Sequence, residues 1–203
     1  MKTNVPYLKA IVCLLVLLNS CTVTKNSIEE LKTSIEDPKK EILCFVQMKD
    51  GTVKNYTTLK LITGVFKTPH LIADGSIIIK PEEIKAYQNK DHYAVSQKEF
   101  TDAKQSYVAK DALPGFAVRI AAGKINVYSL KYYNGHNTAE KLFLQSGDDG
   151  KIAACTAELM GELVKDNNDA YAFFNEKNKT ATLTKKILAI VEIYNNPGDV
   201  SKN

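Results

Sequence analysis

Histidine and acidic side chains are the first groups to consider for catalysis, because they can transfer protons near neutral pH. The chain has three histidines, His70, His92 and His136. No two of them lie within four residues of each other, so none has the spacing of a zinc motif, and we expect neither a metal nor a cofactor. His92 and His136 are the two weak catalytic candidates. The competing interpretation is that each is a half-exposed polar residue at a strand end or in a turn.

Tyrosine has the most unusual count, with ten tyrosines and no tryptophan. Tyr128, Tyr132 and Tyr133 lie in one predicted strand. On an exposed sheet face they would form a platform for a sugar or peptide, since a tyrosine ring offers apolar area and a hydroxyl. The alternative is that these rings fill the interface between a sheet and helices, because aromatic residues at strand spacing usually belong to a core.

Residues 146–151, Ser-Gly-Asp-Asp-Gly-Lys, combine carboxylates with glycines and suggest calcium. An EF-hand loop, however, needs acids at alternate positions and a closing glutamate. Asp and Gly are also the residues that turns require, so we expect a hairpin turn here. The sequence also contains no Gly-rich phosphate loop and no nucleophile elbow.

The first twenty residues are typical of an exported protein. Two lysines and no acid precede the apolar run at residues 10–18, whose length suits a secretory signal peptide. Nine helical residues rise only about 14 Å, which is too short for a hydrocarbon core of about 30 Å. We therefore expect residues 1–20 to be a signal peptide. The alternatives are plain secretion and a short uncleaved anchor.

The residues that follow, Leu18-Asn19-Ser20-Cys21, resemble the bacterial lipobox, although Asn19 departs from its usual small or aliphatic residue. The resemblance implies that Cys21 becomes the first residue and carries a diacylglycerol thioether and an acylated amine. Two or three acyl chains make a lasting membrane anchor. Thr22 in place of an aspartate implies transfer to the outer membrane, with the protein facing the periplasm.

Loss of the signal peptide changes the charge and the cysteine count. Lys2 and Lys9 leave, so 25 basic residues face 23 acidic ones, and the absence of a basic stripe argues against nucleic acid binding. Cys44 and Cys155 are then the cysteines without an assigned role. They could pair in an oxidising compartment, or remain free thiols, as the apolar strand pattern around Cys44 favours.

Residues 21–40 are predicted to form a tether with a short helix, which the Ser27–Glu30 capping box begins and Pro38 ends. Strand patterns then recur in pairs around short turns. The pairs are 42–48 with 52–62, 70–73 with 76–80, 84–88 with 92–96, 116–121 with 125–133, and 142–145 with 151–154. This spacing predicts an antiparallel meander of about eight to ten short strands.

After Cys155 the apolar spacing changes to that of helices. We expect one helix capped by Thr156, a second at residues 167–177, and a third that Thr184 caps and residues 195–198 end. The sequence thus predicts an α+β fold in which three C-terminal helices pack on the sheet. Residues 41–196 would form a single domain, followed by a disordered tail at 197–203.

Several segments follow one another in a familiar order: Ile79-Lys-Pro-Glu-Glu-Ile-Lys-Ala-Tyr87, Gly123-Lys-Ile-Asn-Val-Tyr128, Tyr132-Tyr133, Cys155 with Leu159 and Leu163, and Ile187-Leu-Ala-Ile-Val-Glu-Ile-Tyr-Asn195. This order resembles a widespread group of uncharacterised exported proteins of Bacteroidota and covers most of residues 50–196. The resemblance implies an exported or lipid-anchored protein, rich in strands, with a helical end. It supplies no catalytic residues.

These observations together favour a non-enzymatic, lipid-anchored protein of the cell envelope. It would be a binding or scaffolding module, attached to the membrane by lipid on Cys21, whose partner is an envelope protein or a glycan. The alternative is a hydrolase that acts on envelope glycan or peptide, with His92 or His136 at its active site.

Overall fold

The computed structural model describes residues 44–64, 66–101, 110–176 and 182–197. The expected signal peptide, Cys21, the tether and residues 198–203 of the tail lie outside the described residues. None of the described helices is both long enough and apolar enough to cross a membrane.

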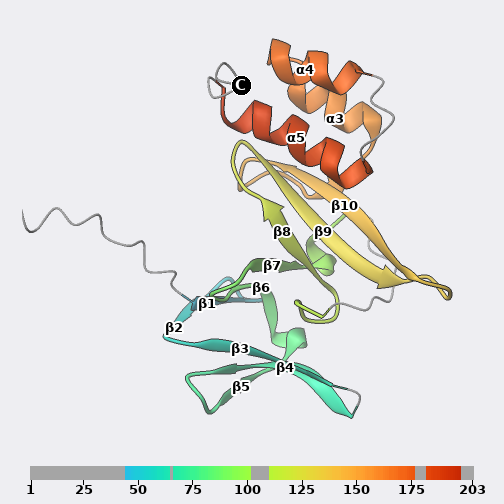
Figure 1. Cartoon of the computed structure of the whole chain (residues 1–203). Helices are drawn as coiled ribbons and strands as arrows, with labels where there is room; N and C mark the ends of the chain where they lie inside the picture. Colours follow the sequence, from blue (N-terminus) through green and yellow to red (C-terminus); the bar gives the residue numbers. More distant parts are fainter. Residues whose placement is uncertain (1–43, 65, 102–109, 177–181, 198–203) are drawn as a thin grey trace, which may run out of the picture. The chain divides into compact units, whose positions relative to one another are not determined.

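Eight strands form one antiparallel sheet in the spatial order β2-β1-β6-β7-β8-β9-β10-β11 (Figure 1). Their bounds are β1 (Cys44–Met48), β2 (Val53–Tyr56), β6 (Ile84–Gln88), β7 (Tyr93–Ser96), β8 (Phe116–Ala121), β9 (Ile125–Tyr133), β10 (Thr138–Ser146) and β11 (Ala153–Ala154). From β6 onward each strand pairs with the next strand in the chain. The predicted antiparallel meander of short strands is therefore confirmed.

Three further strands, β3 (Leu59–Gly64), β4 (Lys67–Ala73) and β5 (Ile77–Ile79), form a second antiparallel sheet. The prediction of one continuous strand over residues 52–62 is therefore wrong. The backbone N–H groups of Thr57 and Thr58 donate to Asp74 Oδ1, each at 2.9 Å, instead of extending a strand ladder. At this point the chain leaves the first sheet and starts the second.

The second sheet packs on one face of the eight-stranded sheet. Their shared core contains residues from both sheets together with Ala112 and Leu113. The larger sheet contributes Cys44, Val46, Ile84, Tyr87, Ala94 and Phe116, and the smaller one Leu59, Leu71, Ala73 and Ile79. Burial of these side chains is the main stabilising contribution at this end of the sheet.

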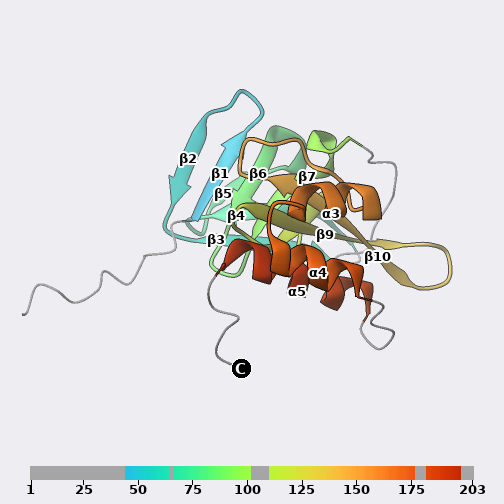
Figure 2. The ribbon, with the colours of Figure 1, turned by 90° about the horizontal axis from the view of Figure 1, so that it is seen from above.

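Three helices, α3 (Ala157–Val164), α4 (Asn168–Asn175) and α5 (Leu183–Asn195), cover the β9–β10 end of the sheet (Figure 2). Their core joins Ile125, Val127, Leu142 and Leu144 of the strands to Met160, Val164, Ala170, Ile187, Ile190 and Val191 of the helices. Because side chains alternate along a strand, this is the same sheet face that the second sheet covers. The predicted α+β fold with three C-terminal helices on the sheet is confirmed.

The N-terminal cap of α3 is the predicted residue, whereas the N-terminal cap of α5 is a different one. Thr156 caps α3 as predicted, since its hydroxyl accepts a hydrogen bond from the N–H of Leu159. The prediction that Thr184 caps the last helix is wrong: Thr182 does so, accepting from the N–H of Lys185. The hydroxyl of Thr184 instead donates to the carboxylate of Glu140 on β10, at 2.7 Å.

Candidate functional site

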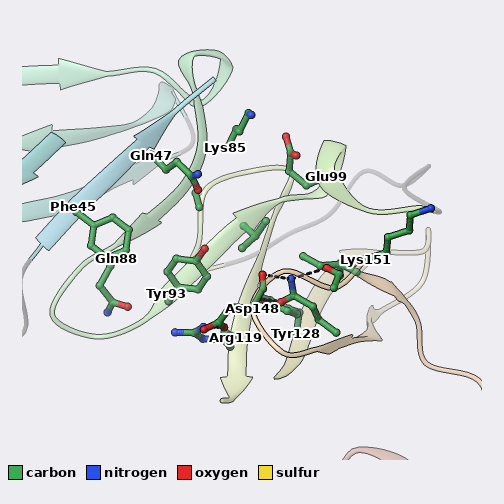
Figure 3. A pocket seen from close by; sticks show the side chains of 15 residues that line it. Phe45, Gln47, Lys85, Gln88, Tyr93, Glu99, Arg119, Tyr128, Asp148 and Lys151 are labelled. Atoms are coloured by element: carbon green, nitrogen blue, oxygen red, sulfur yellow. Dashed lines mark hydrogen bonds and ion pairs between the residues drawn. The ribbon is translucent and has the colours of Figure 1, made fainter. Parts of the chain in front are cut away.

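The opposite face of the eight-stranded sheet contains a hollow of about 480 Å³ (Figure 3). Strands β1 and β6 supply one side and β7, β8 and β9 the floor. The 3₁₀ helix η2 (Gln97–Glu99) and the residues after β10 supply the other side. Its larger polar and aromatic lining residues are Phe45, Gln47, Lys85, Gln88, Tyr93, Glu99, Arg119, Tyr128, Asp148 and Lys151.

A stack of aromatic and guanidinium groups dominates the floor. The Cζ atom of Arg119 lies 4.3 Å from the ring centroid of Tyr93, a cation–π contact between β8 and β7. The ring centroid of Phe45, on β1, lies 6.1 Å from that of Tyr93. Burial raises the pKa of Tyr93, so its phenol stays protonated and remains a hydrogen-bond donor. Three strands thus place two aromatic rings and one cation side by side.

Arg119 is the only arginine among 27 lysine and arginine residues. Its side chain is 26% exposed, and its Nη1 lies 3.5 Å from Oδ1 of Asp148, which is 83% exposed. A guanidinium has five N–H donors in a planar fork, which a lysine cannot reproduce. Arg119 uses this fork for the ion pair with Asp148 and for a hydrogen bond with Tyr128, while its planar face stacks on Tyr93.

A buried amide network supports the floor. Gln145 Oε1 accepts from the hydroxyl of Tyr128 at 2.7 Å and from Asn126 Nδ2 at 3.3 Å. Its Nε2 donates to the carbonyl oxygens of Asp148 and Gly150, both at 2.9 Å. Gln145 therefore ties strand β9 to the turn that carries Asp148. Burial also raises the pKa of Tyr128 to about 12, so this phenol remains a donor as well.

The three tyrosines predicted as a platform occupy different environments. Tyr128 is 2% exposed; its ring packs on Phe100, with centroids 6.0 Å apart, and it lines the floor of the hollow. Tyr132 is half-buried on the same strand face, and Tyr133 is exposed on the other, where its hydroxyl donates to the carbonyl of Gly135. Of the three, Tyr128 alone lines the hollow.

The histidine candidates lie in separate turns. His92 lines a second hollow of about 540 Å³ together with Asp91 and Asp111, and its Nε2 lies 2.9 Å from the hydroxyl of Tyr87. Burial lowers the pKa of His92, and the two aspartates act in the opposite direction. His136 is exposed in the turn between β9 and β10. The fold therefore does not bring the two histidines together in either hollow.

The structure also bears on three other features of the sequence, namely the acidic side chains, the Asp-Asp-Gly turn and the two cysteines. Across the described ranges, no three His, Cys, Asp or Glu side chains lie close enough to hold a metal ion. Residues 147–150 form the turn after β10, in which Asp148 Oδ1 accepts from Asn126 Nδ2. Cys44 is buried and Cys155 half-buried, and both are free thiols.

The sequence analysis missed the residues that define the hollow. Phe45, Tyr93 and Arg119 lie on strands far apart in the sequence, and sheet pairing alone brings them together. One signal was available: a single arginine in a chain that otherwise uses lysine. Arginine is preferred where a planar, multidentate cation is needed, so its position marks a site worth testing.

Comparison of the chain with protein-family models, with curated proteins and with solved structures found no match.

Proposed function

We propose that this is a lipid-anchored protein of the cell envelope whose sheet hollow binds a glycan chain without modifying it. The observation that carries the proposal is the row of Phe45, Tyr93 and Arg119, which runs from one side of the hollow onto its floor (Figure 3). Aromatic faces pack against the C–H groups of a sugar ring, and planar polar groups bond its hydroxyls.

The rim of the hollow suits a sugar as well. Gln47 and Gln88 each offer an amide that both donates and accepts, and Glu99 adds a carboxylate acceptor. A sugar hydroxyl also both donates and accepts hydrogen bonds. A hydroxyl that pairs with one of these amides therefore leaves neither group without a partner. Lys85 and Lys151 add cations at the edge, which suits a glycan that carries acidic or N-acyl groups.

Binding fits this lining better than catalysis does. Burial raises the pKa of both Tyr93 and Tyr128, which keeps the two phenols protonated at physiological pH. Asp148 is occupied by Arg119 and Asn126. The Tyr128 hydroxyl donates to Gln145, which leaves the Tyr93 phenol to orient a ligand by a hydrogen bond. General acid–base catalysis instead needs groups whose pKa lies near the working pH.

Calorimetry with soluble peptidoglycan fragments tests the binding site. The ligands are glycan strands with and without their peptide stems, and the variants are Tyr93→Ala and Arg119→Lys. We expect both glycans to bind, and each variant to weaken binding by about tenfold or more, as at buried aromatic and arginine contacts. Tyr171→Ala, which removes an exposed tyrosine of α4, is the matched control and should bind normally. Binding of the stem-bearing glycan alone would assign the hollow to peptide, and no binding of either would refute the site.

The anchor is tested separately on the chain expressed in a Gram-negative host. We expect intact mass to show lipid on Cys21 and the protein to sediment with membranes. Cys21→Ser should lose the lipid mass, while Cys13→Ser, which changes the cysteine inside the apolar run, should retain it. A wild-type protein without lipid, cut at another site, would show instead that it is secreted.

A hydrolase is the second candidate, and the hollow around His92 favours it. Burial lowers the pKa of His92, which keeps its imidazole neutral and able to accept a proton. Asp91 and Asp111 line the same hollow. Incubation with intact peptidoglycan, followed by mass spectrometry of released fragments, tests this activity. Products that appear with the wild type and disappear with His92→Gln would support the hydrolase; no products from the wild type would reject it.

A further inference from the structure

The three-stranded sheet presents apolar and basic side chains together on its outward face. Its other face is buried through Leu59, Leu71 and Ile79. Since successive strand residues point to opposite faces, the residues between them point outward. The outer patch, as we call this set, consists of Lys60, Ile62, His70, Ile72, Ile78 and, after β5 on extended backbone, Lys80.

The strand register places these side chains next to one another. Ile72 on β4 lies between Lys60 on β3 and Ile78 on β5, and Ile62 lies opposite His70. Ile78 is 62% exposed, and Ile62 and Ile72 are half-buried. Ile72 and Ile78 are thus direct cross-strand neighbours, and Ile62 lies diagonal to Ile72. The three form an apolar strip outside the cores that the described residues build, a feature that marks an interaction surface.

The charge of the outer patch is basic. Both of its permanently charged side chains, Lys60 and Lys80, are lysines. Asp74, the acidic residue in the β4–β5 turn, is directed at the N–H groups of Thr57 and Thr58. Apolar side chains flanked by lysines are the pattern of a surface that lies on anionic lipid, because isoleucine enters the interface while lysine reaches the phosphates.

We propose that the outer patch docks onto the surface of a membrane that contains anionic phospholipids. The proposed lipid anchor would keep that surface within reach, since the 22 residues between Cys21 and Cys44 span at most about 80 Å when extended. Association through a second copy of the chain is less favourable. A two-fold contact places the same patch against itself and brings lysines toward lysines.

Vesicle flotation tests the docking without any contribution from acyl chains. The protein is residues 21–203 with Cys21→Ala, and the vesicles contain phosphatidylglycerol with phosphatidylethanolamine, or phosphatidylcholine alone. We expect binding to the anionic vesicles that weakens as salt is raised. The double variants Ile72→Ser/Ile78→Ser and Lys60→Glu/Lys80→Glu should each lower the partition coefficient by about tenfold or more.

The control variant, Leu183→Ser/Lys124→Glu, removes an exposed leucine and a lysine outside the patch and should bind as the wild type does. Thermal unfolding midpoints verify that every variant is folded. The proposal is overturned if the folded wild type does not float with anionic vesicles, or if both patch variants float equally well. Sedimentation showing that the wild type self-associates through the patch would overturn it too. Because the protein tested carries no lipid, these outcomes are independent of the anchor and of glycan binding.

Discussion

At the scale of single residues, amides determine the shape of the hollow on the eight-stranded sheet. Gln145 is buried and uses both ends of its amide, accepting from Tyr128 and Asn126 and donating to the carbonyls of Asp148 and Gly150. Asn126 reinforces the same turn by donating to the carbonyl of Gly147 and to Asp148 Oδ1. The position of Asp148 beside Arg119 therefore depends on two neutral side chains, Asn126 and Gln145.

Replacing Gln145 by leucine should destabilise the protein by about 2–3 kcal/mol, because it leaves a buried phenol and two turn carbonyls without partners. Gln47→Leu, on the half-buried wall of the same hollow, should cost less than about 1 kcal/mol. Urea unfolding followed by circular dichroism measures both. An equal decrease in the free energy of unfolding for the two variants would show that the hydrogen bonds of Gln145 stabilise the protein no more than those of a half-buried surface glutamine.

The two thiols allow a second test at this scale. Burial raises the pKa of Cys155 to about 11, and Cys44 is completely buried. At pH 8 the native protein should therefore react slowly with iodoacetamide, and the rate at Cys155 should rise with pH as more thiolate forms. After denaturation without reductant, Cys44 and Cys155 should both be alkylated. Failure of either to react would indicate a disulfide.

At the scale of elements, local sequence signals identified the hairpins and helices well. Asp74-Gly75 takes up positive φ angles of 47° and 77°, as a tight hairpin turn requires, and β4 and β5 flank it as predicted. The break between β2 and β3 could not be predicted, because the strand pattern continues through Thr57 and Thr58. Their partner, Asp74, lies 16 or 17 residues further along the chain. The hollow on the large sheet escaped prediction for the same reason, since non-local strand pairing creates it.

Asn195 at the end of α5 acts as a clip between a helix and a hairpin. Its Oδ1 accepts from the N–H of Ile125 at 2.9 Å, and its Nδ2 donates to the carbonyl of Ile125 at 3.0 Å. Gly123 permits this approach, because a Cβ there would lie 2.5 Å from Asn195 Nδ2. The Asn195 side chain thus bonds both backbone groups of Ile125, as a residue of a neighbouring strand would.

Asn195→Ala should therefore lower the free energy of unfolding by about 2 kcal/mol, since it leaves both backbone groups of Ile125 without this partner. Asn196→Ala, which changes the exposed neighbouring asparagine, should have little effect. Thermal unfolding by calorimetry compares the two variants. If Asn196→Ala is as harmful as Asn195→Ala, the loss arises from the helix end and the clip is not responsible.

At the scale of the whole molecule, one sheet face carries two separate apolar cores. The second sheet covers one half and the helices cover the other. The opposite face is filled near β9 by Phe100, Phe143 and Ile152 around Tyr128, and beyond them lies the hollow. Ile125 to Leu130 of β9 are consequently buried on both faces, as the mixed polarity of this strand predicts. The central strands thus contribute to both cores on one face and to the hollow on the other.

Whether these parts form a single domain can be measured with one cavity in each core. Leu71 and Ile190 are 0% and 1% exposed, so replacing either by alanine should cost about 2–5 kcal/mol. If the two cores unfold cooperatively, each variant should show a single unfolding transition. Its midpoint should then occur at the same urea concentration whether it is followed by far-ultraviolet circular dichroism or by tyrosine fluorescence. Two transitions, with Leu71→Ala shifting one and Ile190→Ala the other, would show that each core folds separately. In that event the interval of residues 41–196 would comprise two domains, and a ligand in the hollow, which touches strands from both halves, would stabilise each of them.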